Sequence, residues 1–130
     1  NLIYNNEKNK FTCIDWRTDF GGDNYGDLYY DLGKMLGGII LDYQAVKEGK
    51  LQYEEKNESV LLNDCSITDS NLYINLLQSF CQTRNLNWNK ILLLVPLIYL
   101  NMSPLHDSPF DKYLFALSQL HFSKVLDANN

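Results

Sequence analysis

The segment Tyr25-Gly26-Asp27-Leu28-Tyr29-Tyr30-Asp31-Leu32 decides the fold, and it follows Ile14-Asp15-Trp16-Arg17 across a glycine-bearing loop. Asp27 is a residue type preferred at a helix N-cap. After it, apolar residues recur at three- and four-residue steps, which predicts a helix from about Leu28 to Leu41. Asp15 instead ends a β-prone run. The strand would fix its backbone, and the loop would leave its carboxylate facing a cleft, where it could hold a cation.

Two hairpins are predicted from pairs of short β-prone runs around polar stretches. Leu2–Tyr4 and Phe11–Ile14 flank the turn-rich stretch 5–10. Leu51–Glu54 and Ser59–Leu62 flank 55–58 in the same way.

The remainder of the chain is predicted to be helical. Thr68 or Asp69 caps a helix whose apolar face consists of Leu72, Tyr73, Leu76, Leu77, Phe80 and Cys81. Asn87 or Asn89 opens a central helix, which is apolar nearly all round, to Leu100. After a loop over 102–107, Ser108-Pro109 is expected to open the last helix.

Composition indicates a single globular domain with an acidic surface. The 130 residues are 45% hydrophobic and 21% charged, and 11 basic against 16 acidic residues leave a net charge of −5. Such a surface repels a phosphate backbone, and the sequence contains no Lys/Arg cluster, so nucleic acid is not expected as a partner.

Cysteine spacing and hydropathy bear on the compartment. The chain has three cysteines, Cys13, Cys65 and Cys81, an odd number with no Cys-x-x-Cys pair. This pattern argues against a disulfide scaffold and against a zinc module. It favours the reducing cytoplasm as the compartment. The longest apolar run, Ile91–Leu100, has ten residues, whereas a bilayer span needs about 20. Neither a membrane span nor a signal peptide is therefore expected.

The motifs resemble the C-terminal lobe of the aminoglycoside phosphotransferase and choline kinase group, which has the protein-kinase-like fold. Members of that group show an Asn closing the catalytic loop, a hairpin, an Ile-Asp-Trp or Ile-Asp-Phe segment, and then Gly-Asp-x-x-Tyr-Asp-Leu-Ala opening a helix. This chain has Asn1, a predicted hairpin, Ile14-Asp15-Trp16 and Gly26–Gly33, with Gly33 in place of the usual Ala. The motif-level resemblance covers Asn1–Gly38, and beyond it the likeness is architectural.

The resemblance implies a role for each matching residue. Asp15 would be the metal-binding aspartate, and Asn1 the second metal ligand for Mg²⁺ held with ATP. Asp27 and Asp31 would be structural, one capping its helix and bracing the catalytic-loop backbone. The catalytic base, the glycine-rich loop and the ATP-binding lysine of the group have no counterpart in residues 1–130.

Three further residues are candidates for lining a substrate pocket. Trp16 and Arg17 could border the acceptor, although a core tryptophan and an Arg–carboxylate pair are the commoner roles for such residues. The stretch Leu100–His106 resembles members associated with bacterial surface-polysaccharide gene clusters, which makes His106 a substrate-lining candidate. His106 also lies beside Ser103 and Asp107, but triad members normally converge from separate elements.

Taken together, the sequence predicts an α+β, mostly α-helical, kinase-like C-lobe fragment. Residues 1–26 would form a metal-binding hairpin and loop, and residues 27–130 a helical bundle with a small hairpin near 51–62. The expected function is phosphoryl transfer from ATP to a small-molecule hydroxyl, and the preferred acceptor is a sugar or an amino alcohol destined for surface polysaccharide. The alternatives are a non-catalytic helical interaction or scaffold module and a degenerate kinase-like domain.

The chain starts at Asn1 with a strand-like run, which suggests that it begins in the middle of a fold; a processed or trimmed chain is the alternative. On the first interpretation, the 130 residues alone are expected to be inactive, because phosphoryl transfer needs the absent base and phosphate cradle. The face left by the missing part is expected to be apolar and to favour self-association.

Overall fold

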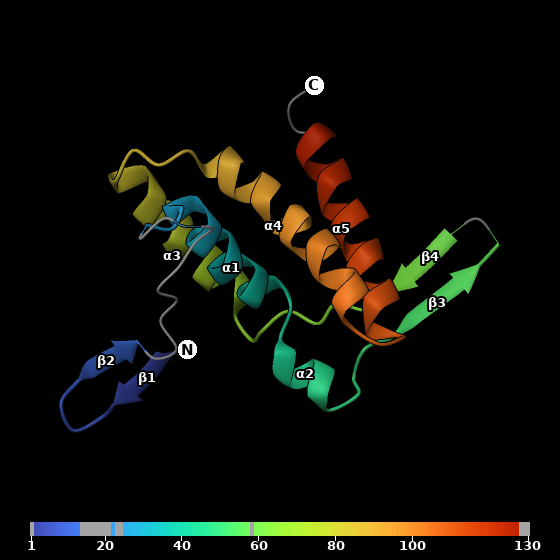
Figure 1. Ribbon diagram of the computed structural model, residues 1–130, viewed down its shortest axis with the longest axis horizontal. Helices are drawn as coiled ribbons and strands as arrows, with labels where there is room; N and C mark the ends of the chain where they lie inside the picture. The colour runs from blue at the N-terminus through green and yellow to red at the C-terminus, as the bar shows by residue number, and fades with distance from the viewer. Residues whose placement is uncertain (1, 14–21, 23–24, 58, 128–130) are drawn as a thin grey trace.

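A computed structural model describes residues 2–13, 22, 25–57 and 59–127 of the chain. In these ranges the protein is α+β and mostly helical, with two small antiparallel hairpins and a group of packed helices (Figure 1), as the sequence predicted. The strands are β1 (Leu2–Asn5), β2 (Lys10–Cys13), β3 (Tyr53–Lys56) and β4 (Ser59–Leu62). The helices are α1 (Leu28–Ile40), α2 (Tyr43–Lys47), α3 (Ser70–Thr83), α4 (Trp88–Met102) and α5 (Phe110–Asp127), with a 3₁₀ turn at Ser103–Leu105.

Both hairpins turn through an asparagine in the left-handed backbone region. Asn9, with φ 46°, precedes β2, and Asn57, with φ 53°, follows β3. Asparagine tolerates this conformation better than most residues other than glycine. In the first hairpin, Tyr4 pairs with Phe11 across the strands, and their rings lie 4.8 Å apart.

The second hairpin begins two residues later than the predicted run at Leu51. Beyond Tyr53 only one backbone hydrogen bond of the pairing remains, from Asn63 N to Gln52 O at 3.3 Å. The Asn63 side chain supplies the other contacts: its Oδ1 accepts from Gln52 N at 2.7 Å, and its Nδ2 donates to Lys50 O at 2.8 Å. Tyr113 Oη of α5 donates to Asn63 O at 2.7 Å, which ties this end of the hairpin to the helices.

Helix α4 occupies the middle of the helical group, between α1 and α5 (Figure 1). It carries no charged residue from Ile91 to Met102, as expected for a central helix. The core that it organises consists mainly of fully buried side chains from these three helices, namely Leu32 and Leu36 of α1, Ile91, Val95 and Tyr99 of α4, and Tyr113, Leu114 and Leu117 of α5.

Glycines let α1 approach α4 closely. A Cβ added at Gly33 would lie 3.1 Å from Leu94 Cβ and 3.2 Å from Ile98 Cδ1, which is tighter than ordinary contact. One turn further on, Tyr99 Oη donates to Gly37 O at 2.7 Å in the buried interface. Close packing therefore offsets the roughly 1 kcal/mol that a helical glycine costs relative to alanine, and it explains why glycine occupies position 33.

Helix α3 differs from the expectation of one buried apolar face. Its residues Leu77 and Cys81 are buried against the core, but the other members of the predicted face are 43–57% exposed, namely Leu72, Tyr73, Leu76 and Phe80. The predicted apolar face is wider than the surface that the neighbouring helices cover. The helix ends in a Schellman motif, in which Leu86 N donates to Cys81 O and Asn85, at φ 53°, takes the left-handed position.

Two boundaries near the last helix also differ from the prediction. The expected loop over 102–107 is partly the 3₁₀ turn, and α5 begins at Phe110, after Pro109. Ser108 does not cap it. Instead Asp107 O accepts from the backbone N–H groups of Phe110 and Asp111. The carbonyl that accepts the first hydrogen bonds of the helix therefore belongs to Asp107, one residue before the predicted cap, Ser108.

Replacing Tyr99 with Phe is expected to lower the free energy of unfolding by about 1 kcal/mol, because it removes a buried hydrogen bond while keeping the ring. Urea denaturation followed by circular dichroism measures this. Tyr73→Phe, on the exposed side of α3, is the matched control and should change stability by less than about 0.5 kcal/mol. Equal stabilities of the two variants would contradict the role given to the Tyr99–Gly37 contact.

Candidate functional site

The amino end of α1 carries the Gly26-Asp27-x-x-Tyr30-Asp31-Leu32 motif and is the candidate site. Asp27 is the N-cap, as the sequence predicted: its Oδ1 accepts from Tyr29 N at 2.8 Å. Its backbone carbonyl accepts from the N–H groups of Tyr30 and Asp31. The aspartate thus satisfies amide groups of the first turn and places a negative charge at the positive end of the helix dipole.

A set of polar contacts joins this helix end to the start of α4. Lys90 Nζ lies 3.5 Å from Asp27 Oδ2 and 4.0 Å from the centre of the Tyr29 ring. Tyr29 Oη accepts from Asn87 N at 3.1 Å, and Asn87 Oδ1 caps α4 by accepting from Lys90 N at 3.2 Å. The amino ends of the two helices are therefore fixed relative to each other, and the backbone around Asp27 is held by contacts distant in sequence.

Asp31 lies one turn further along, on the exposed side of α1. Leu28 and Met35, three and four residues away on the same helical face, are 52% and 56% exposed. An exposed carboxylate thus stands between two exposed apolar side chains. This face could receive a further segment of backbone, to which Asp31 would offer hydrogen-bond acceptors.

The residues predicted to hold the metal lie outside the described part of the chain. These are Asp15 and Asn1, and the substrate-lining candidates Trp16 and Arg17 lie outside it too. Within residues 2–13, 22, 25–57 and 59–127, no group of three or more His, Cys, Asp or Glu side chains could hold a metal ion. The metal-binding roles of Asp15 and Asn1 and the substrate-lining roles of Trp16 and Arg17 therefore stay predictions.

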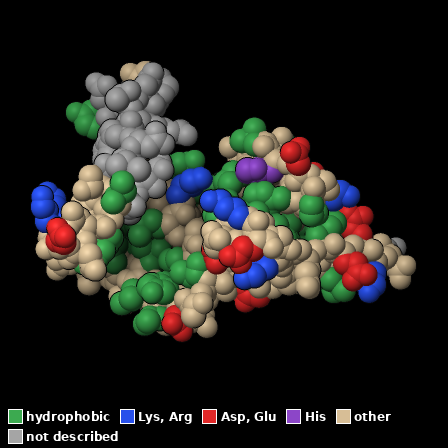
Figure 2. Space-filling model, turned by 90° about the horizontal axis from the view of Figure 1, so that it is seen from below, with side chains coloured by type: hydrophobic (Ala, Val, Ile, Leu, Met, Phe, Trp, Pro, Cys, Tyr) green, Lys and Arg blue, Asp and Glu red, His purple; other side chains and the backbone are tan. Residues whose placement is uncertain are grey.

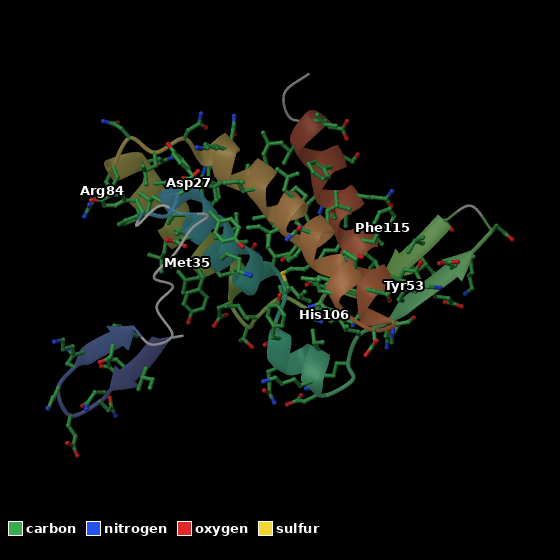
Figure 3. The ribbon with its side chains drawn as sticks, viewed as in Figure 1. Asp27, Met35, Tyr53, Arg84, His106 and Phe115 are labelled. Carbon is green, nitrogen blue, oxygen red and sulfur yellow. The ribbon has the colours of Figure 1, made fainter. Side chains whose placement is uncertain are left out.

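His106, the remaining substrate-lining candidate, lies far from the amino end of α1. Figure 3 shows Asp27 and His106 toward opposite ends of the helical part. His106 is exposed after the 3₁₀ turn, and its ring stacks at 4.7 Å on Phe110. Ser103 Oγ donates to Asp111 O at 2.9 Å instead of bonding the imidazole, so these residues do not form a triad.

Of the three tyrosines at this end of α1, only Tyr29 packs against the core. Its side chain is half-buried, whereas Tyr25 is 87% exposed and Tyr30 is 38% exposed. Burial of Cys81, predicted from its place on α3, is confirmed.

Two cavities beside α5 were not predicted from the sequence. One, of about 170 Å³, lies between α1, α4 and α5, and the other, of about 300 Å³, lies between α3, α5 and the 62–66 segment. His121 and Lys124 line both. Their i, i+3 spacing on α5 is a sequence signal, but the opposing walls come from distant segments, which no local pattern reveals.

Burial and charge set the protonation of the polar groups at these cavities. Burial, and secondarily the Lys124 charge, lower the pKa of His121, so its imidazole is neutral near pH 7. Hydrogen bonds from Ser66 lower the pKa of Asp64, whose Oδ1 accepts from Ser66 N at 2.8 Å.

None of the described helices is long and apolar enough to cross a membrane. Hydrophobic side chains nevertheless gather in a hollow on one face of the molecule, with charged side chains mostly toward its edges (Figure 2).

Asp27→Ala is expected to lower the free energy of unfolding by about 1 kcal/mol, because it removes the cap of α1. Asp27→Asn keeps a capping oxygen and loses only the exposed contact with Lys90, so it should cost less than half as much. Thermal and urea unfolding measure both. Asp31→Asn is the control and should lie within about 0.5 kcal/mol of the parent; a larger loss for Asp31→Asn than for Asp27→Ala would reverse the roles given to the two aspartates.

No family model, curated protein sequence or solved structure matches the chain. The residues of this chain and their placement are therefore the basis for its function.

Proposed function

We propose that residues 1–130 are the C-terminal part of an ATP-dependent phosphotransferase acting on a small-molecule hydroxyl. The observation that carries the proposal is the Tyr25–Gly33 motif, preceded by Ile14-Asp15-Trp16 and placed at the capped start of a helix. The sequence resemblance to the aminoglycoside phosphotransferase and choline kinase group rests on the same residues. A sugar or an amino alcohol, destined for surface polysaccharide, is the acceptor that we favour.

The order of elements supports this proposal. A hairpin, β1–β2, precedes the Asp15 segment, and a capped helix, α1, follows it. In phosphoryl transfer, protein groups chiefly position the nucleotide and neutralise developing charge. An aspartate two residues after the end of β2 in the sequence suits the first task, because a nearby strand would limit its movement.

The capped end of α1 would serve as a platform for the catalytic machinery. Asp27 and its contacts with α4 fix this helix end, and the exposed Asp31 stands beside Leu28 and Met35. A catalytic loop packed on this face would cover the two apolar side chains and could donate backbone N–H groups to the carboxylate. The described residues would then support the site instead of reacting.

Asp15 and Asn1 would hold Mg²⁺ together with the phosphates of ATP. Mg²⁺ is commonly bound by one or two carboxylates plus substrate phosphates and water, so these two residues suffice as protein ligands. The base that deprotonates the acceptor hydroxyl would come from a segment preceding Asn1. On this proposal, residues 1–130 do not transfer phosphate by themselves.

A second function, a non-catalytic interaction module, is favoured by one observation. Helix α3 leaves four large apolar side chains 43–57% exposed, namely Leu72, Tyr73, Leu76 and Phe80. Such a face suits a partner protein. The two functions differ in what Asp15 does, because an interaction module has no use for a metal ligand.

In the protein that contains this chain with its preceding catalytic segment, Asp15→Asn is expected to lower phosphoryl transfer by at least about 1,000-fold. It removes the charge that holds the metal while preserving side-chain volume. ADP release and acceptor phosphorylation, screened over sugars and amino alcohols, measure the loss. Asp19→Asn, four residues further along the sequence, is the matched control and should keep most of the activity.

Folding of both variants is checked by circular dichroism and thermal unfolding. Unchanged turnover in a folded Asp15→Asn variant would refute the phosphotransferase proposal. Absence of ATP turnover in the parent protein with every acceptor, together with stable partner binding through α3, would favour the interaction module.

A further inference from the structure

We propose that the two cavities beside His121 form one binding site for a small organic anion with an apolar body, such as an aromatic carboxylate, held at its charged end by Lys124. This site is independent of the proposed phosphotransferase function. It lies at the other end of α1 from Asp27, because Ile40, the last residue of that 13-residue helix, lines both cavities. At 1.5 Å per residue, the two ends are about 20 Å apart.

The cavities share one edge that contains polar residues and differ in the rest of their lining. His121, Lys124 and Ile40 belong to both. Leu36 and Val95 line the smaller one, and Ile74 and Leu117 the larger. The smaller cavity has the composition typical of small-molecule pockets, with a mainly apolar lining and a few polar groups, whereas the larger one also has several polar residues in its lining.

The polar groups at this edge are not all engaged by the protein itself. The His121 ring meets the Tyr99 ring edge-on at 6.3 Å and has no hydrogen-bond partner among the described residues. Its side chain is half-buried. A neutral imidazole has one donor and one acceptor nitrogen, so His121 could pair with a ligand at the junction of the two cavities.

Charge at the edge favours an anionic ligand. Asp64, Lys124 and His121 are the titratable groups lining the larger cavity together with Cys65 and Tyr113. In the larger cavity the Asp64 carboxylate accepts from Ser66 N and also attracts the Lys124 ammonium, although Lys124 forms no ion pair within 4.0 Å with any residue in the described ranges. The smaller cavity has no acidic residue in its lining. The positive charge that both cavities share is therefore that of Lys124, and it is least compensated on the side of the smaller cavity.

Size limits the ligand to a small molecule. Volumes of about 170 and 300 Å³ lie at or below the lower end of the range for small-molecule pockets. A single aromatic ring or a short branched chain can fill one cavity, with its carboxylate at the shared edge. A nucleotide is too large for either cavity.

The test uses benzoate and benzyl alcohol, which share a ring and differ in charge. Each is titrated into the ¹⁵N-labelled 130-residue chain while amide resonances are followed by NMR. Saturable shifts are expected at Ser66, Ile74 and His121, with benzoate bound about tenfold more tightly because of its charge-assisted contact. Shifts confined to the exposed side of α3, or no saturable shift with either probe, would overturn the proposal.

Variants of Lys124 test the role of its charge. Lys124→Gln should reduce the ratio of the benzyl alcohol Kd to the benzoate Kd to about one. Lys124→Arg, which keeps the charge, should retain the ratio of the parent chain. Lys112→Gln is the matched control, because Lys112 is an exposed lysine of α5 that lines neither cavity. Equal affinity for the two probes in the parent chain, or a preference that survives Lys124→Gln, would also overturn it.

Discussion

The close contact of α1 with α4 is the constraint on which the rest of the structure depends. Gly33 lets Leu94 and Ile98 approach the α1 backbone, and Tyr99 Oη fixes the register through its hydrogen bond to Gly37 O. With this pair set, α5 packs on the other side of α4, and Ser118 Oγ reaches the Pro96 carbonyl at 2.9 Å in the buried interface. Pro96 lies inside α4, and Ser118 Oγ gives its carbonyl a side-chain donor in a helix that is otherwise apolar.

The same contact places the candidate site. Because α1 and α4 are held together along their length, their amino ends meet, and Asp27, Lys90 and Tyr29 can join there. The polar junction adds little stability through its exposed ion pair, which is about half accessible on each side. Its effect is to define where the backbone entering α1 must lie. A site that depends on a loop before α1 benefits from such fixation, because positioning dominates phosphoryl transfer.

Local signals in the sequence predicted much of the fold, and non-local packing accounts for what they missed. Asp27 and Asn87 are capping residues followed by apolar periodicity, so the starts of α1 and α4 could be predicted closely. The face of α3 was misjudged because periodicity shows which side chains are apolar but not how much of them a neighbouring helix covers. The start of β3 was misplaced because the Asn63 side chain, instead of its carbonyl, accepts from Gln52 N, an effect that strand propensities do not include. The metal-binding roles proposed for Asp15 and Asn1 rest on the order of motifs and on the resemblance that it carries. The two cavities at His121 and Lys124 depend on segments far apart in the sequence and had no local signal beyond the spacing of these two residues.

The central claim, that Asp15 holds a metal for a nucleotide, is tested most directly by crystallography with ATP and Mn²⁺ as a stand-in for Mg²⁺. The crystal should contain the protein that includes this chain and its preceding segment. We expect an anomalous peak about 2.1 Å from a carboxylate oxygen of Asp15 and from phosphate oxygens of ATP. An Asp15 side chain directed into solvent, with the nucleotide's metal held by other residues, would contradict the claim.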